Sequence, residues 1–408
     1  MILLLTFKIG YPRIISIVLI FSMFLLIGNY QVSWAQPNIN DPALKIEKFV
    51  DGLSSPTSMA FVGSNILVLE KGGSVRSISN GVLENEPILT VNVRDDNERG
   101  LLGIAVLDNQ VYLYFTELLD DDSIKNRVYK YEWDGKNLIE RALILDLPGL
   151  PGPNHDGGKL LIDKPTDSNV PSLFAVIGDL NHNGVLQNVK NGNQPDDTGI
   201  IFRVNPEDGS GITDNPFDNE LSTSKYFAYG IRNSFGMDID PVSGTLWNTE
   251  NGPGQYDELN IVKKGFNSGW EVTMGPISQE GKDENDLHNI PGSHYADPAL
   301  SWFEPPALTA IEFLNSTMLG DNYANNMFVG DFNFGNLYRF VLNNQRDGLD
   351  LADLGTGLTD KVVNNAEELS SITFGSGFGR ITDIKTGPDG FIYILSYSDG
   401  AIYRISPV

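Results

Sequence analysis

A histidine in a loop rich in glycine and proline is the first residue of this sequence that could act as a proton acceptor. His155 lies in PGPNHDGG at residues 151–158 and is one of four histidines in the chain. Because a neutral imidazole accepts protons near pH 7, His155 at the rim of a rigid sheet would suit a general base. The alternative is a solvent-facing loop histidine without a chemical role.

An arginine–asparagine pair between glycines is the second candidate. Arg232 and Asn233 lie in YGIRNSFG at residues 229–236. A planar cationic fork beside an amide suits an anionic or quinone-type ligand. The alternative is that Arg232 binds main-chain carbonyls of the fold.

Two oxygen-rich segments are candidates for binding a hard cation such as Ca²⁺. Residues 249–260, TENGPGQYDELN, combine carboxylates, amides and accessible carbonyls, the ligand mixture that Ca²⁺ takes. Residues 179–184, DLNHNG, match the start of a calcium loop, but Lys190 stands where an EF-hand has its bidentate Glu, which excludes a complete EF-hand. The alternatives are an acidic turn that binds nothing and a plain hydrogen-bonded turn.

The elements that must position these candidates are short β-rich repeats. Six copies of a strand–turn–strand phrase begin near residues 59, 103, 159, 236, 310 and 383. Each copy supplies three or four strands, which is the content of one propeller blade, and a closed ring would cover the sheet edges. The pattern predicts an all-β fold, a six-bladed β-propeller of four-stranded antiparallel blades, with a pair of β-sandwiches as the structural alternative. The functional groups are then expected on the loops over the central channel.

Composition excludes several classes of function. The formal net charge of −25 repels phosphate backbones, so nucleic acid is not an expected partner. The chain has no cysteine, which excludes disulfides, thiolate nucleophiles, cysteine-ligated zinc and iron–sulfur clusters.

The N-terminal segment predicts export. Basic residues precede an apolar run at residues 14–27, and small residues at Ser33 and Ala35 suit cleavage before Gln36. We therefore expect a signal peptide or N-terminal anchor at 1–35, a linker at 36–44 and the propeller at 45–408. The protein would be secreted or otherwise extracytoplasmic, and membrane anchoring would be through the N-terminus only.

Six phrases in this chain resemble the soluble quinoprotein sugar dehydrogenases, the glucose/sorbosone and aldose sugar dehydrogenase family. They are NERGLLGIAV (97–106), HDGGKLLI (155–162), VIGD (176–179), GIIFRVNPEDGS (199–210), YGIRNSFGMDIDPVSGTLWNTENGPGQYDELNIVKKGFNSGW (229–270) and GRITDIKTGPDGFIYIL (379–395). The resemblance implies a six-bladed propeller that holds pyrroloquinoline quinone (PQQ) on a Ca²⁺. It also implies oxidation of the C1 hydroxyl of an aldose to the lactone, with a quinone, cytochrome or cupredoxin as external electron acceptor.

The resemblance further implies roles for single residues. His155 resembles the base that takes the C1 hydroxyl proton, and Arg232 and Asn233 resemble the pair that contacts the cofactor. Gly252 and Pro253 resemble the positions whose carbonyls hold the cofactor's calcium.

Five more positions resemble residues near that site. Asp257 and Glu258 resemble a structural calcium site. Glu98 and Asp179 look like polar positions that line the site, and Arg380 resembles the first arginine of the last-blade motif.

Two positions depart from the family pattern. Thr382 stands where many members have arginine, and Asn333 where well-studied members have lysine. Both changes remove positive charge from the cofactor side. They favour the alternative of a cofactor-free propeller that binds a glycan or a protein, and a Ca²⁺-dependent lactonase is a third reading. The segment with Trp302, Phe303, Pro305 and Pro306 could form an apolar platform for the sugar.

Overall fold

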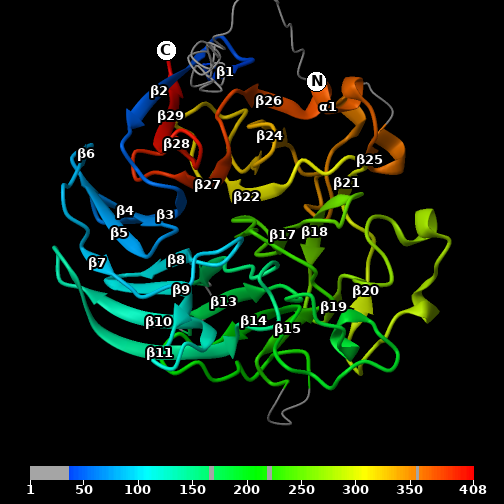
Figure 1. Cartoon of the computed structure of the whole chain (residues 1–408). Coiled ribbons are helices and arrows are strands. Elements are labelled where there is room, and N and C mark those ends of the chain that lie inside the picture. Colours follow the sequence, from blue (N-terminus) through cyan, green and yellow to red (C-terminus); the bar gives the residue numbers. More distant parts are fainter. Residues whose placement is uncertain (1–35, 165–169, 218–222, 355–357) are drawn as a thin grey trace, which may run out of the picture. The chain divides into compact units, whose positions relative to one another are not determined.

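The computed structural model describes residues 36–164, 170–217, 223–354 and 358–408, and they form an all-β propeller (Figure 1). Residues 36–408 are one compact unit. The prediction of an all-β propeller is confirmed. The predicted signal peptide or anchor at 1–35 lies outside the described residues. Within the described ranges, no helix is long and apolar enough to cross a membrane.

The strands form six sheets, which follow one another along the chain. The first contains β3 (Pro56–Val62), β4 (Asn65–Glu70), β5 (Ser74–Ser79), β6 (Val82–Leu83) and β7 (Leu89–Thr90). The second contains β8 (Leu101–Leu107), β9 (Gln110–Leu118), β10 (Ile124–Trp133) and β11 (Leu138–Pro148). The third contains β12 (Leu160–Asp163), β13 (Ser172–Ile177), β14 (Ile200–Val204), β15 (Tyr226–Tyr229), β19 (Phe266–Asn267) and β20 (His294–Tyr295).

The other three sheets come from the second half of the chain and the N-terminal strands. The fourth contains β16 (Gly236–Ile239), β17 (Leu246–Glu250), β18 (Asp257–Val262), β21 (Leu300–Trp302) and β25 (Val362–Val363). The fifth contains β22 (Leu308–Phe313), β23 (Met327–Asp331), β24 (Leu337–Phe340), β26 (Thr373–Ser376) and β1 (Asn38–Ile39). The sixth contains β27 (Ile381–Thr386), β28 (Ile392–Ser396), β29 (Ala401–Pro407) and β2 (Leu44–Val50).

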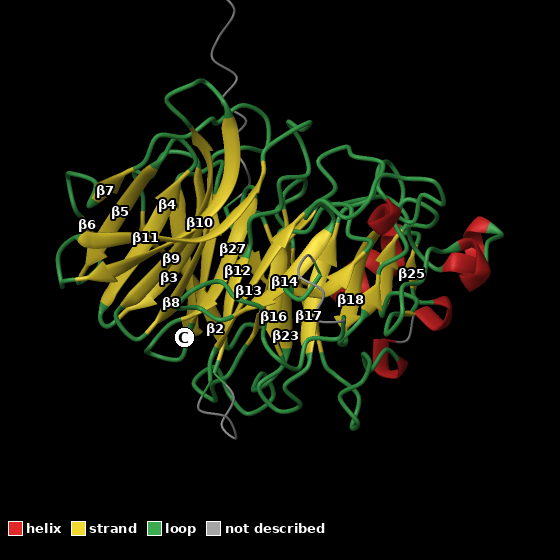
Figure 2. Ribbon diagram, turned by 90° about the horizontal axis from the view of Figure 1, so that it is seen from below, coloured by secondary structure: helices red, strands yellow, loops and turns green. Residues whose placement is uncertain are grey.

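Helical structure in the described residues is limited to short pieces between strands, most of them gathered at one side of the molecule (Figure 2). They are the helix α1 (Ala366–Ile372) and the 3₁₀ turns Val185–Gln187, Ile277–Glu280, Glu284–Asp286, Ala352–Leu354 and Leu358–Asp360.

The prediction of four strands in every blade holds for only some of the sheets. Two sheets have four strands, whereas the others carry one or two additional short strands. In the third, fourth and fifth sheets these additional strands lie at the outer edge of the sheet, away from the strand that is nearest the centre of the ring. The outer edge of a blade exposes unpaired main-chain groups, and the extra strands cover that edge.

The inner strands of consecutive sheets contact one another in a closed cycle, β3–β8–β12–β16–β22–β27–β3. The N-terminal strand β2 closes the ring, because it pairs antiparallel with β29 and completes the last sheet. The segment at 36–44, which we expected to be a linker, is instead part of the propeller. Its strand β1 pairs with β26, and Asn40 N–H donates to the Phe374 carbonyl.

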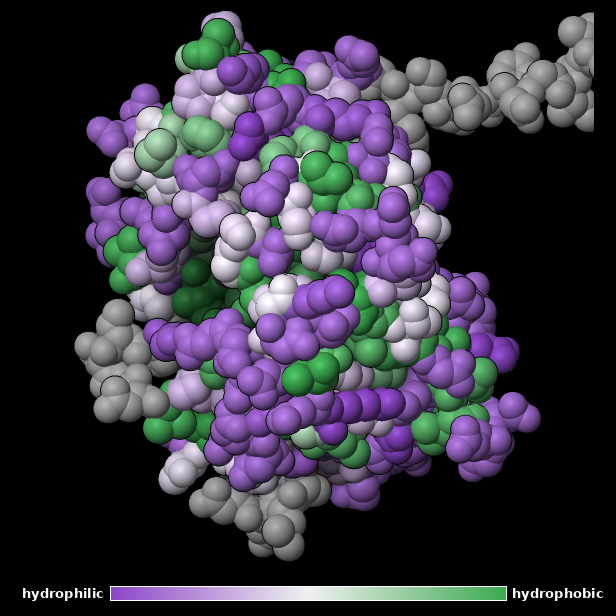
Figure 3. All heavy atoms as spheres, turned by 90° about the vertical axis from the view of Figure 1, so that its left-hand side faces the viewer, coloured by the Kyte–Doolittle hydropathy of each residue, from purple (hydrophilic) through white to green (hydrophobic). Residues whose placement is uncertain are grey.

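The position of a strand within its sheet determines its hydrophobic pattern. The middle strand β13, SLFAVI, is buried at every position, while the edge strand β2, LKIEKFV, mixes buried and exposed residues. A strand covered on both faces has to be apolar throughout, and an edge strand does not. The outer face shown in Figure 3 is mainly hydrophilic, in keeping with the acidic composition.

Candidate active site

A cavity of about 490 Å³ opens where all six inner strands begin. Its lining includes Ser58 on β3, Thr309 on β22 and Thr382 on β27, together with residues at or just before the starts of β8, β12 and β16. A volume of this size suits a small-molecule ligand. The remaining lining residues are Thr57, Lys71, Asn97, Glu98, Leu102, Asn154, His155, Gly157, Lys159, Arg232, Asn233, Phe235, Asn251, Gly252, Ala307, Phe332 and Tyr397.

His155 lines this cavity and is only 7% exposed, so the reading as a solvent-facing loop histidine is wrong. Its Nδ1 lies 2.6 Å from Oδ1 of Asp179. Asp179 also accepts from the Asn181 N–H at 2.7 Å and from the Trp270 indole at 2.6 Å. Since this carboxylate accepts from every other neighbour, we assign the His155 proton to Nδ1. Nε2, which has no partner among the described residues, is then the proton-accepting atom.

The glycines around His155 let two loops approach closely. His155 has a left-handed backbone with φ of +67°, next to Gly157 at +62°. A side chain on Gly178 would lie 2.4 Å from the carbonyl oxygens of both His155 and Arg232. The VIGD phrase therefore needs its glycine so that the His155 and Arg232 loops can meet over one site.

Glu98 connects the histidine loop to the arginine–asparagine pair. Its Oε2 accepts from the His155 main-chain N–H at 2.6 Å and from the Asn233 amide at 2.9 Å. We call Glu98, His155, Asp179 and Asn233 the mouth network. Three of them line the cavity, whereas Asp179 lies behind His155 and does not.

Arg232 lines the cavity, but its side chain is partly engaged with the fold. Its guanidinium donates to the Asn251 carbonyl at 2.7 Å and lies 5.2 Å from the Trp270 ring centroid. Both interpretations of this residue therefore hold in part, because Arg232 binds a main-chain carbonyl and still faces the cavity. Burial lowers the pKa of Arg232, although it remains a cation near neutral pH.

Arg380 lies beside the cavity and not in its lining. It is exposed and packs 4.9 Å over the ring of Phe332, and its carbonyl accepts from the Tyr397 N–H. Both of these partners line the cavity.

The loop after β17 presents main-chain oxygens near the cavity. Gly252 is in the lining, whereas Pro253 is exposed and outside it. No residue that the structure describes donates a hydrogen bond to either carbonyl. A side chain on Gly252 would lie 2.1 Å from the Gln255 carbonyl oxygen, so the tight loop requires glycine here.

The carboxylates of Asp257 and Glu258 are buried behind that loop. Asp257 accepts from the Gly252 and Leu308 N–H groups, and Glu258 accepts from the Gly275 N–H and from Asn260. Burial raises the pKa of Asp257 to about 6. Burial, followed by repulsion from the cross-strand neighbour Glu250, raises the pKa of Glu258. In the described ranges, no three acidic, histidine or cysteine side chains form a group that could hold a metal ion.

The segment at 179–184 contains a hydrogen-bonded turn. The His182 N–H donates to the Asp179 carbonyl at 2.7 Å, and the side chain of Asp179 is directed to His155. The His182 ring lies 2.8 Å from Asp196.

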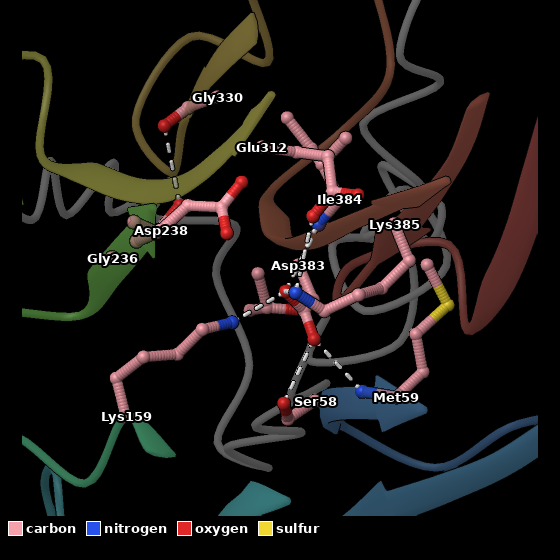
Figure 4. Close-up of polar contacts among 12 residues, drawn as sticks. Ser58, Met59, Lys159, Gly236, Asp238, Glu312, Gly330, Asp383, Ile384 and Lys385 are labelled. Carbon is pink, nitrogen blue, oxygen red and sulfur yellow. Dashed lines mark hydrogen bonds and ion pairs between the residues drawn. The ribbon is translucent and has the colours of Figure 1, made fainter. Parts of the chain in front are cut away.

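A second buried polar group, which we call the channel cluster, lies further along the inner strands (Figure 4). Lys159, just before β12, lies 2.6 Å from Asp383 on β27. Lys385, also on β27, lies 3.3 Å from Glu312 on β22 and 3.8 Å from Asp383. Asp238 on β16 completes the cluster, and burial, followed by repulsion from Glu312, raises its pKa to about 7.

Asp383 is the centre of the channel cluster. It is fully buried, and its second oxygen accepts from Ser58 Oγ at 2.8 Å and from the Met59 N–H at 2.9 Å on β3. Burial alone would raise the pKa of Asp383, but Lys159 and Lys385 together bring it below the usual value. The cluster thus connects inner strands from five of the sheets through charged contacts.

Among the cavity residues that sequence reasoning missed are both lysines of the lining, Lys71 and Lys159. Lys159 is part of the HDGGKLLI phrase, and its place at the start of an inner strand could have identified it. The predicted sugar platform is wrong for Trp302, which is 1% exposed and packs 5.5 Å from Tyr338 in the core. Phe303 is exposed and packs against Tyr256.

The chain is similar to known sugar dehydrogenases. The family model described as glucose / sorbosone dehydrogenase matches residues 53–404. Aldose sugar dehydrogenase YliI of Escherichia coli is 27% identical over 387 residues, which cover 92% of this chain and 95% of that protein. The apo crystal structure of the soluble aldose sugar dehydrogenase from Escherichia coli superposes with a TM-score of 0.68 at 26% identity, covering 90% of this chain and 100% of the other. The PQQ-bound aldose sugar dehydrogenase from Streptomyces coelicolor shares the fold, with a TM-score of 0.64 at 23% identity over 90% of this chain and 99% of the other.

Proposed function

Because the chain belongs to the glucose/sorbosone dehydrogenase family, we propose that it is a PQQ-dependent aldose dehydrogenase whose six sheets act as six blades around one active site. Its reaction would be oxidation of the C1 hydroxyl of an aldose to the lactone. The observation that carries this proposal is the mouth network, in which His155 faces the cavity and its Nε2 has no partner in the described ranges.

His155 is the general base of the proposed reaction. Asp179 holds the Nδ1 proton, so the lone pair of Nε2 is available to the sugar hydroxyl. Glu98 fixes the main chain of His155, which keeps the ring at the cavity. The sugar loses the proton of its hydroxyl to Nε2 and a hydride from C1, and this two-electron oxidation forms the C1=O bond of the lactone.

The lining of the cavity fits a cofactor that carries carboxylates. Cationic side chains and amides, among them Arg232 and Asn233, face the cavity, and Arg380 is close to its edge. When bound, PQQ would supply the acceptor for the C1 hydride, and a bound calcium ion would polarise that acceptor. An external acceptor such as a quinone, cytochrome or cupredoxin would then remove the two electrons.

Calcium would be held beside the cavity by the carbonyls of Gly252 and Pro253. Neither carbonyl accepts a hydrogen bond from a described residue, and carbonyl oxygens are normal Ca²⁺ ligands. A second calcium at Asp257 and Glu258 would have to compete with the main-chain and amide donors that these carboxylates now accept from.

Reaction outside the cytoplasm is the setting that we propose for this enzyme. The support is the basic and apolar N-terminal segment with its small-residue cleavage site. The same segment, left uncleaved, would anchor the enzyme to a membrane.

Reconstitution tests the proposed function. The purified protein is mixed with PQQ and CaCl₂, and the reduction of an artificial dye is followed with a panel of aldoses. We expect sugar-dependent, saturable dye reduction that requires both additions. The absence of any sugar-dependent reduction, together with an unchanged PQQ absorbance spectrum, would contradict the proposal.

A further inference from the structure

The lining of the cavity is more positive than negative, although the protein as a whole is strongly acidic. The formal net charge of the chain is −25. In the lining, Lys71, Lys159 and Arg232 are cationic, whereas Glu98 is the carboxylate. Lys159 is also paired with Asp383, which lies outside the lining, so Lys71 and Arg232 account for the positive balance. The charge of Glu98 is already directed to the N–H donors of His155 and Asn233. A cavity with this balance favours an anionic group of a ligand.

Lys159 has hydrogen-bonding capacity that the fold does not use. The residue is 5% exposed, and its ammonium group makes one hydrogen bond, to Asp383. An ammonium group can donate three, and no further partner of Lys159 is found in the described part of the chain. Leaving buried N–H donors unpaired is costly, so an acceptor from the cavity would improve this site.

Lys71 brings a second positive charge to the same cavity. Its Nζ donates to the main-chain carbonyl of Asp95, a neutral acceptor, and it forms no ion pair with any residue that the structure describes. The main chain of Lys71 is fixed as well, because its carbonyl accepts from the Leu101 N–H at 3.0 Å. The charge of Lys71 is therefore held near the cavity and is not neutralised by an ion pair with a described carboxylate.

Thr382 and Asn333 stand at the two positions where the family pattern has a cation, and both side chains are neutral. Thr382 lines the cavity, but its hydroxyl donates to the Pro56 carbonyl at 2.9 Å. The Asn333 amide donates to the Pro305 carbonyl at 3.3 Å, and the residue lies outside the lining.

We propose that Lys71 and Lys159 bind the carboxylate-bearing end of PQQ and replace the cations that are absent at positions 382 and 333. This inference rests on the proposed function, because it assumes that the cofactor is PQQ. Lys159 would offer its unused N–H donors from the start of β12, and Lys71 would add charge from the turn after β4. Arg232 would contact the cofactor separately.

Binding of PQQ to the purified protein, measured without sugar, tests this inference. Titrations followed by isothermal calorimetry would compare the wild type with Lys71→Gln and Lys159→Gln. We expect each variant to bind PQQ about tenfold more weakly or worse, because each loses a charge-assisted contact. The matched control is Lys164→Gln, which removes an equally charged but exposed lysine outside the cavity and should bind like the wild type.

Two additional arms separate charge recognition from loss of folding. Thr382→Arg added to Lys71→Gln should recover most of the affinity, because it returns a cation to the lining. The trimethyl ester of PQQ, which lacks the carboxylates, should bind the wild type and Lys71→Gln equally. If Lys159→Gln does not fold, Lys71→Gln and its rescue decide the outcome.

The outcomes distinguish this inference from the proposed function. If the wild type binds PQQ and both lysine variants bind it equally well, the inference is wrong and the proposed function stands. If the wild type does not bind PQQ at all, both are wrong.

Discussion

The mouth network and the channel cluster are both buried and polar, yet they balance charge in different ways. In the mouth network, Glu98 and Asp179 accept mainly from N–H groups, and His155 keeps one ring nitrogen free at the cavity. In the channel cluster, Asp383 is paired directly with two lysines. The uncharged N–H donors of the mouth network fix the position of His155 and leave its ring able to exchange a proton. The ion pairs of the channel cluster instead hold neighbouring inner strands together. We therefore expect substitutions in the first group to affect rate and those in the second to affect stability, except that Lys159 also lines the cavity and would affect cofactor binding as well.

The largest effect should follow from loss of the free histidine nitrogen. His155→Ala should lower kcat by about 10²- to 10⁴-fold, which is the usual contribution of a general base. Dye reduction with saturating aldose measures it, and PQQ binding should be retained. A kcat within about threefold of the wild-type value would show that His155 is not the general base. The expected difference between the mouth network and the channel cluster would then be wrong.

Asp383→Ala should give the largest loss of stability. Without this carboxylate, Lys159 and Lys385 lose their shared partner, and breaking a buried ion pair costs about 3–5 kcal/mol. Urea denaturation measures the free energy of unfolding. The control is Asp146→Ala, whose carboxylate is half exposed and pairs with Arg127 at the surface, and which should cost less than about 1 kcal/mol. Equal losses in the two variants would show that the channel cluster has no special role in stability.

Asp179→Asn should reduce the rate without unfolding the protein. The amide can no longer hold the Nδ1 proton of His155 as a carboxylate does, so we expect kcat to fall about 10- to 100-fold. The pH at which the rate reaches half its maximum should also move, which a purely structural role would not cause. The control is Asp196→Asn beside the partly buried His182, outside the cavity. If neither kcat nor the pH profile changes, Asp179 does not orient the base.

The channel cluster should also give the stability of the protein a pH dependence. Burial and Glu312 raise the pKa of Asp238 to about 7, whereas an unfolded aspartate has a pKa of about 3.9. Between these values the folded state binds more protons, so this carboxyl stabilises the protein at low pH and its contribution is lost as the pH rises through about 7. The slope is at most about 1.4 kcal/mol per pH unit.

Asp238→Asn should remove that slope. The comparison is the midpoint of urea denaturation at intervals from pH 5 to pH 8 for the wild type and the variant. Parallel curves would show that another group is responsible.

The repeats and the family phrases predicted the all-β propeller and singled out part of the cavity lining, namely Glu98, His155, Arg232, Asn233, Gly252 and Thr382. Glycines such as Gly178 and Gly252 within these phrases are required by close approaches of the main chain. The sequence could not reveal the direction in which each side chain points. Asp179 turns behind His155, and Trp302 turns into the core, because neighbours from distant parts of the chain determine the direction of each side chain. Lys71 and Lys159 were missed for a similar reason. They are far apart in the chain, and only the closed ring brings both to one cavity.

The most direct test of the central claim is a single turnover followed in the absence of oxygen and dye. The protein is loaded with one equivalent of PQQ and Ca²⁺, and its absorbance is recorded after rapid mixing with an aldose. We predict complete loss of the quinone absorbance with formation of one equivalent of lactone in the wild type, and slow or no loss in His155→Ala. A spectrum of bound PQQ that excess aldose leaves unchanged would contradict the assignment of this cavity as a sugar dehydrogenase site.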